Sequence, residues 1–372
     1  METELSKAAI SPLTSASFGQ RKGGRVSEIS RAVTAPTFLL VVLMLLTALG
    51  GIMMVSVSLG AIHIPLETMV FALLQRRQLT EAQHTILFSI RLPRVIASSI
   101  VGGALAVSGL MFQGLFRNPM ADPYIIGASG GAALGACIGI VFLSQITIFG
   151  FSATALLAFA GSVLTMAVVY ALARSRGRTS GVTLLLAGFA VGTMLTNSTY
   201  LFELFDPNSS SGIRIVAAWL HGTIGIPEWR QLAVTSALFA SAIVVTFPLM
   251  RRLNTLALGD DYAHQLGIRV EATRIAIILA GSLLTAIAVS LGGLISFAGL
   301  IIPHVARLIF GPDNVRLLPV TAIGGALFLV VADTLSRTVL APSELPVGIL
   351  MVFLGGPFFI YLLRKGKREY AL

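Results

Sequence analysis

The chain has 372 residues, of which 26 basic and 16 acidic side chains, 42 in all, are charged. Charged residues make up 11% of the sequence, against about 25% in soluble proteins, while 55% of the residues are hydrophobic and the mean hydropathy is +0.89. This composition excludes a soluble enzyme and a free nucleic-acid-binding protein. It predicts an all-α protein that crosses a lipid bilayer many times.

The first 34 residues are polar, rich in Ser, Thr and Arg, and lack the short apolar core of a cleavable signal peptide. We interpret residues 1–34 as a cytoplasmic tail, residues 35–366 as the membrane domain, and residues 367–372 as a second cytoplasmic tail. The single cysteine, Cys137, permits no disulfide within the chain and is interpreted as a small core residue.

Ten charge-poor apolar windows follow the N-terminal tail, and each approaches the length of about 20 residues that a membrane-spanning helix needs. They lie near residues 35–62, 95–115, 124–145, 148–172, 183–204, 231–250, 275–292, 294–310, 319–340 and 347–363. The segment between residues 205 and 230 is too short and too polar to span. We predict a short helix there, at one membrane face.

An even number of spans places both termini on the same side of the membrane, and the basic residues indicate which side. With the termini inside, 19 of the 26 Lys and Arg residues lie on the inner side and seven on the outer side. This bias follows the positive-inside rule. Membrane topology therefore explains the net charge of +10 without a nucleic-acid partner.

A driving force within the chain is not evident. Two of the four lysines lie in the N-terminal tail and the other two, Lys365 and Lys367, lie at the C-terminal end, so no glycine-rich phosphate loop carries the lysine that ATP hydrolysis by that route requires. The five histidines are scattered, and no cluster has metal-ligand spacing. Asp333 precedes Arg337 by four residues on one predicted helix face, which suits either a neutral structural pair or a proton relay. We expect the energy for transport to come from a partner.

Several motifs in a fixed order resemble the membrane-spanning permease subunit of ABC importers for iron-siderophores, haem and cobalamin. The motifs are Arg91-Leu92-Pro93-Arg94, Gly102-Gly103-Ala104, Arg117-Asn118-Pro119-Met120-Ala121-Asp122-Pro123, Gly299-Leu300-Ile301-Ile302-Pro303-His304, Gly311-Pro312-Asp313-Asn314 and Glu344-Leu345-Pro346-Val347-Gly348. The resemblance implies a homodimer of ten-span subunits in the bacterial inner membrane. It also implies two cytoplasmic ATP-binding subunits, which hold ATP and magnesium, and a periplasmic substrate-binding protein. This chain itself is expected to bind no cofactor.

The resemblance implies a docking site and a coupling site. Arg91, Arg94 and Arg337 match arginines that receive acidic residues of the binding protein at the outer rim, although Arg337 also suits the pair with Asp333. An inner loop, residues 256–270, resembles the coupling helix that fits a groove on the ATPase. Its expected contact residues are Leu258, Gly259, Asp260, Asp261, Ala263, Gln265, Leu266 and Gly267.

The pathway is expected at the dimer axis, along the fifth span. The family's cytoplasmic gate often carries Ser or Thr, whereas the matching positions here are Gly181 and Val182, preceded by Thr179 and Ser180. Three residues near the outer mouth are candidate contacts for an anionic metal complex or, alternatively, anchors at the membrane interface: Arg214, Trp219 and His221. His304 follows a kinking proline and is interpreted as structural.

We therefore predict a non-enzymatic permease that imports an iron chelate by alternating access, with an iron-siderophore favoured and haem or cobalamin as alternatives. The rival interpretation is an ion-coupled secondary transporter of a small solute. An integral-membrane enzyme is disfavoured, since no convergent set of His, Asp and Glu lies at one membrane depth.

Overall fold

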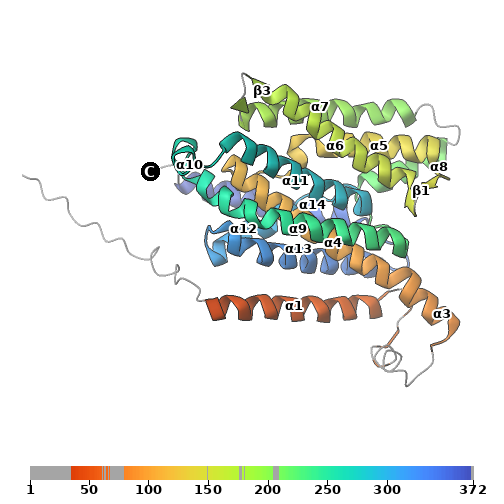
Figure 1. Ribbon diagram of the computed structural model, residues 1–372. Coiled ribbons are helices and arrows are strands. Elements are labelled where there is room, and N and C mark those ends of the chain that lie inside the picture. Colours follow the sequence, from red (N-terminus) through yellow and green to blue (C-terminus); the bar gives the residue numbers. More distant parts are fainter. Residues whose placement is uncertain are drawn as a thin grey trace, which may run out of the picture.

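A computed structural model describes residues 35–60, 62, 64–65, 67, 79–148, 150–175, 178–179, 181–203 and 209–369. The predicted N-terminal tail and the last three residues lie outside this part of the chain. The described residues form a bundle of long helices in an all-α architecture with two small hairpins, β1–β2 and β3–β4 (Figure 1).

The first half of the bundle contains α1 (Ala35–Ser58), α3 (Glu81–His84), the π-helix η1 (Thr85–Arg91), α4 (Leu92–Phe116), the 3₁₀-helix η2 (Pro123–Ile126), α5 (Ala128–Leu143), α6 (Ala153–Ala173) and α7 (Gly181–Glu203). The strands of the hairpins are β1 (Thr147–Ile148), β2 (Phe151–Ser152), β3 (Arg174–Ser175) and β4 (Arg178–Thr179). The second half contains α8 (Ser209–Leu220), α9 (Trp229–Ala257), α10 (Asp260–Gln265), α11 (Val270–Gly292), α12 (Ala298–Phe310), α13 (Asn314–Thr338) and α14 (Val347–Glu369).

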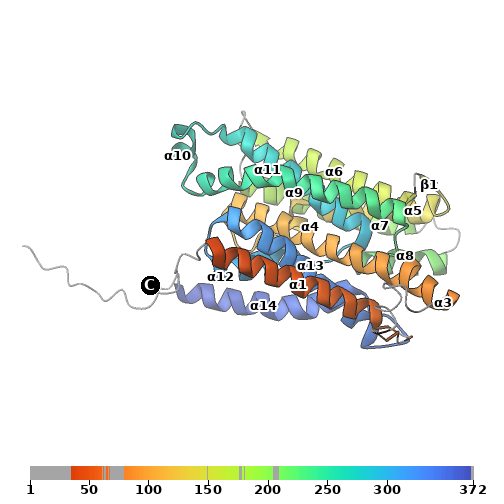
Figure 2. The same cartoon turned by 60° about the horizontal axis from the view of Figure 1, so that its bottom comes forward.

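The apolar windows of the sequence correspond to these helices. Within the described residues, seven helical segments are long and apolar enough to cross a membrane, and three shorter apolar helices begin at Ala128, Ala298 and Val347. The short helix expected between residues 205 and 230 is α8. The start of α1 and the end of α14 lie at the same end of the bundle as α10, which projects beyond α9 and α11 (Figure 2).

Two predicted spans are shorter than expected. The window 294–310 contains only the 13 residues of α12, because the chain turns at Gly293 (φ 65°) and Phe297 (φ 68°) before the helix begins. Thirteen residues cover about 20 Å, less than the roughly 30 Å of a bilayer core. The window 124–145 likewise yields a 16-residue helix, α5, after the turn η2.

Helix α4 lies at the centre of the bundle and contacts α9, α11, α12 and α13. Its side chains are buried almost continuously from Pro93 to Gln113. Glycines allow this close approach: a Cβ at Gly102 would overlap the carbonyl oxygen of Gly325, and one at Gly109 would overlap that of Gly299. Small residues let helices pack closely where lipid supplies no hydrophobic drive for association.

Replacing Gly109 with alanine is expected to destabilise the bundle, because the added methyl group meets backbone atoms of α12 that cannot move aside. Overpacking of this kind costs about 1–3 kcal/mol or more. Gly50→Ala is the matched control, since nothing lies within 4 Å of a Cβ there. Thermal unfolding of the purified protein in detergent should show a lower midpoint for Gly109→Ala alone, and equal midpoints would contradict the packing described.

Candidate functional site

The predicted coupling loop folds as the six-residue helix α10 between two glycines with positive φ, Gly259 (121°) and Gly267 (79°). Asp260 and Asp261 lie in its first turn, where the helix dipole favours acidic side chains. Ala263 is fully buried and joins the main hydrophobic core. The loop therefore holds a defined conformation rather than serving as a polar connector of undefined shape.

Ion pairs fix α10 to the ends of two long helices. One carboxylate oxygen of Asp260 lies 3.2 Å from Nη2 of Arg117, and the other lies 2.6 Å from Nη2 of Arg274. Arg117 caps the end of α4 with a left-handed backbone (φ 51°) and also donates a hydrogen bond to the carbonyl oxygen of Leu256. A displacement of α10 would thus act directly on α4 and α11. These two arginines were not among the coupling residues expected from the sequence.

Three exposed apolar side chains lie on α10 and at its two ends: Leu258 caps the end of α9, Tyr262 lies within α10, and Leu266 follows its last residue. Leu258, Tyr262 and Leu266 are 66%, 65% and 66% exposed, respectively. We call these three residues the α10 apolar face. Two were expected contact residues and the third, Tyr262, was not. Asp261 and Gln265 are also exposed, so together with the α10 apolar face they form a mixed surface.

A cluster of buried charges lies at the opposite end of the bundle. The carboxylate of Asp333, which is fully buried, accepts hydrogen bonds from Nε of Arg94 and Nε of Arg337, each at 3.1 Å. Nη1 of Arg94 also lies 2.8 Å from the half-exposed Glu344. Arg337 donates to the hydroxyl of Ser56 at 2.8 Å. The pair between Asp333 and Arg337 that the sequence predicted is confirmed.

Arg91 belongs to the same region but makes different contacts. Its guanidinium donates to the backbone carbonyl oxygens of Val57 and Ser58, both at 2.9 Å, and to that of Ile62. Arg91, Arg94 and Arg337 are 6%, 6% and 7% exposed. These side chains are therefore held by contacts inside the bundle rather than standing free on a rim: Arg91 on the backbone at the end of α1, and Arg94 and Arg337 on Asp333. Their role in docking stays a prediction.

The expected pathway residues lie at opposite ends of the bundle. Gly181 begins α7 and Val182 is 68% exposed. Thr179 lies in β4, and Ser180 is outside the described residues. At the other end, Arg214 and His221 are exposed, and Trp219 is half-buried beside a cavity of about 310 Å³. The structure thus does not bring the two groups together, and both roles stay predictions.

His304 lies inside α12, one residue after Pro303, and its ring meets the edge of Phe358 with centroids 6.1 Å apart. This packing agrees with a structural role for His304, although the bend between helices precedes α12 rather than falling at this residue.

Comparison with known proteins places this architecture in a family. The FecCD transport family profile matches residues 33–365, nearly the whole chain. The chain belongs to the FecCD transport family. The helices, α10 and the buried charges described above are therefore features of a FecCD family member.

Relatives within the FecCD family are named as permeases. The chain is 40% identical over 310 residues to the cobalamin import system permease protein BtuC of Halobacterium salinarum, covering 83% of this chain and 82% of the relative. It is 37% identical to the hemin transport system permease protein HmuU of Yersinia pestis, covering 86% and 95%. It is 36% identical to the iron(3+)-hydroxamate import system permease protein FhuG of Bacillus subtilis, covering 90% and 97%.

A solved structure supports the same assignment. It is described as an inward-facing conformation of a metal-chelate type ABC transporter, and its chain is similar to this one with a TM-score of 0.76 and 27% identity. The match covers 88% of this chain and 99% of that chain. The all-α permease fold expected from the sequence is confirmed.

Proposed function

We propose that the chain is the permease subunit of an ATP-driven importer that moves a metal chelate across the inner membrane by alternating access. An iron-siderophore is the favoured substrate, with haem and cobalamin as alternatives, since relatives named for all three classes match over most of the chain. Both termini would then be cytoplasmic, and the end with α3 and α8 would face the periplasm. The chain would work as a homodimer with one periplasmic binding protein and two ATP-binding subunits, which would hold ATP and Mg²⁺.

The α10 surface is the observation that carries this proposal. An exposed apolar face on a short helix is suited to a partner's groove, and the ion pairs of Asp260 link it to α4 and α11. Exposed apolar patches rimmed by polar residues mark interaction sites. The rival interpretation, an ion-coupled carrier, rested on Asp333 as a proton relay. That carboxylate is held between two arginines, so nothing favours the rival.

The proposal is tested by purifying the chain with a tag after Leu372 from native membranes, followed by mass spectrometry of the proteins that accompany it. We expect an ATP-binding subunit, and a periplasmic binding protein whose bound metal complex can be identified. Uptake of that complex into vesicles should require ATP. ATP-independent uptake driven by an ion gradient would overturn the proposal.

The buried charge cluster supports a second test, on docking. Glu344 is a half-exposed carboxylate on the otherwise buried Arg94, so an acidic residue of the binding protein can compete for the same guanidinium. Glu344→Gln removes the internal competitor and a repulsive charge, and is expected to raise the association rate several-fold at low salt. Surface plasmon resonance with the binding protein measures this rate.

Glu81→Gln, an exposed change in α3 at the same end of the bundle, is the control for docking. It removes the same charge without touching Arg94. An equal rise in both variants would show that only the net charge matters, and a lower rate in Glu344→Gln would show that Glu344 itself contributes to docking. Either result would contradict the competition proposed here.

A further inference from the structure

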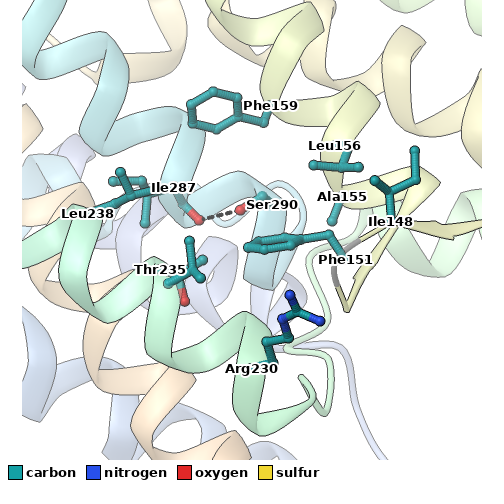
Figure 3. Close-up of a pocket in the computed structure, with 11 residues that line it drawn as sticks. Ile148, Phe151, Ala155, Leu156, Phe159, Arg230, Thr235, Leu238, Ile287 and Ser290 are labelled. Atoms are coloured by element: carbon teal, nitrogen blue, oxygen red, sulfur yellow. Dashed lines mark hydrogen bonds between the residues drawn. The ribbon is translucent and has the colours of Figure 1, made fainter.

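A cavity of about 460 Å³ opens between α6, α9 and α11, beside the β1–β2 hairpin (Figure 3). Most of its lining is apolar, with Phe151, Leu156, Phe159, Leu238 and Ile287 drawn around the space. None of the residues that line this cavity belongs to α10 or to the buried charge cluster.

The polar groups of the lining are concentrated near one end. The hydroxyl of Ser290 donates to the carbonyl oxygen of Ile287 at 2.8 Å, and that of Thr235 donates to Gln231 at 2.9 Å, so both are satisfied within their own helices. Arg230 contributes the charged group, and Figure 3 shows its guanidinium directed from α9 toward Phe151 and Ser290. The cavity is thus amphipathic, with a cationic entrance and an apolar body.

The depth of the cavity matches the layers of a bilayer. Arg230 is the second residue of α9, and Leu238 lies eight residues further along, which is about 12 Å at 1.5 Å per residue. Trp229, next to Arg230, is 48% exposed, and tryptophan favours the headgroup level. With α9 crossing the bilayer from this end, Arg230 would lie at headgroup depth, and Leu238 would lie about 12 Å deeper, among the acyl chains.

The cavity also opens sideways, toward the surroundings of the bundle. Val234 and Leu238, on one face of α9, are 42% and 38% exposed. A recess in a membrane-facing surface is filled by lipid, because an empty space forfeits the van der Waals contacts of its lining.

The carboxylate of Glu228, next to the cavity entrance, indicates which kind of lipid headgroup would fit. Glu228 lines the neighbouring cavity of about 310 Å³, which shares Ala155 and Ser290 with the first. The two charged side chains flank one turn: a Cβ at Gly150 would lie 3.2 Å from Oε2 of Glu228 and 3.4 Å from Cβ of Arg230. Side chains of opposite charge on the two sides of Gly150 suit a zwitterion, with its phosphate on Arg230 and its ammonium on Glu228.

We propose that this cavity binds one phosphatidylethanolamine molecule, with an acyl chain between α6, α9 and α11 and its headgroup between Arg230 and Glu228. A primary ammonium donates hydrogen bonds to a carboxylate, whereas the trimethylated headgroup of phosphatidylcholine has no N–H to donate. The site is separate from α10 and from the buried charge cluster, so it would hold a lipid whatever the substrate of the transporter.

The test uses the full chain purified in mild detergent, with bound lipids extracted and quantified by mass spectrometry. Leu238→Trp and Val234→Trp fill the cavity and are expected to lower retained phosphatidylethanolamine several-fold. Arg230→Gln should lower it by roughly tenfold, the range for a lost charge-assisted hydrogen bond. Val244→Trp and Arg252→Gln are matched controls: both residues are exposed on the same helix and neither lines the cavity, so retention should equal that of the original protein.

Headgroup selectivity is tested in nanodiscs of defined lipid composition. Phosphatidylethanolamine is expected to raise the thermal midpoint of the original protein above that in phosphatidylcholine, and Glu228→Gln should remove the difference. Retention unaffected by Leu238→Trp and Val234→Trp would overturn the proposal. So would retained lipid with the composition of the whole membrane, or a lipid-free protein in which a second copy covers residue 238. Uptake measured in the same variants reports separately on the proposed import function.

Discussion

Asp333→Asn is expected to lower the free energy of unfolding by about 3–5 kcal/mol, the range for removing one member of a buried ion pair. The carboxylate is fully buried and holds two guanidiniums, from Arg94 and Arg337, that belong to different helices. Arginine does not deprotonate in proteins, so the substitution leaves buried positive charge without its shared counter-ion. The neutral amide keeps the size of the side chain, which separates the loss of charge from the loss of packing.

Glu344→Gln is the matched control, because it removes a carboxylate from the same cluster at a half-exposed position. Exposed ion pairs contribute about 0–1 kcal/mol, so its thermal midpoint in detergent should remain close to that of the original protein. Similar losses for Asp333→Asn and Glu344→Gln would show that burial does not set the energetics of this cluster.

The sequence alone could not show that Asp333 is buried between two arginines whereas Glu344 is half-exposed. The four-residue spacing of Asp333 and Arg337 predicts their pairing, because such residues share a helix face. Arg94 lies 239 positions away from Asp333, and no local pattern links the two. The burial of the other two arginines depends on similarly distant partners: Arg91 donates to the backbone carbonyl oxygens of Val57 and Ser58, and Arg337 donates to Ser56, 281 positions away.

Helix positions were largely predictable, since long apolar runs are the direct signal of membrane spans. Breaks within such runs were not, because both sides of the break are equally apolar. The turn before α12 places the non-glycine residue Phe297 at φ 68°, a left-handed conformation that few non-glycine residues adopt. The glycine pattern shows the same limit: the composition predicts close helix contacts, but only the structure pairs Gly109 with Gly299.

The short helix α10 could be predicted from the sequence, but only some of its exposed residues could. The glycines and the acidic first turn mark a short helix, and the structure has one. Ala263, expected at the contact with the ATPase, instead packs inward and is fully buried. A bulky residue at this position would therefore disturb the fold of α10 before it could disturb a partner, so an exposed position gives a cleaner test.

Tyr262→Ala is expected to weaken binding of the ATP-binding subunit by at least roughly thirtyfold, the equivalent of about 2 kcal/mol for an aromatic residue at the centre of an interface. Tyr262 lies between Leu258 and Leu266 on the α10 apolar face and is 65% exposed in the single chain. Its removal leaves the ion pairs of Asp260 untouched, so α10 should keep its position. Affinity is measured by titrating the purified ATP-binding subunit onto the chain in nanodiscs, with stimulated ATP hydrolysis as a second readout.

Tyr361→Ala is the control for this experiment, because Tyr361 is a similarly exposed tyrosine, at 60%, on α14 and outside the α10 apolar face. Its affinity for the ATP-binding subunit should stay within about twofold of the original value, since most interface-remote surface changes have small effects. A comparable loss in both variants would assign the effect to the membrane domain rather than to α10. Normal affinity in Tyr262→Ala, with α10 intact, would contradict the proposal that Tyr262 is the central contact of the coupling surface. The contact would then have to be made by the polar residues exposed beside it, Asp261 and Gln265.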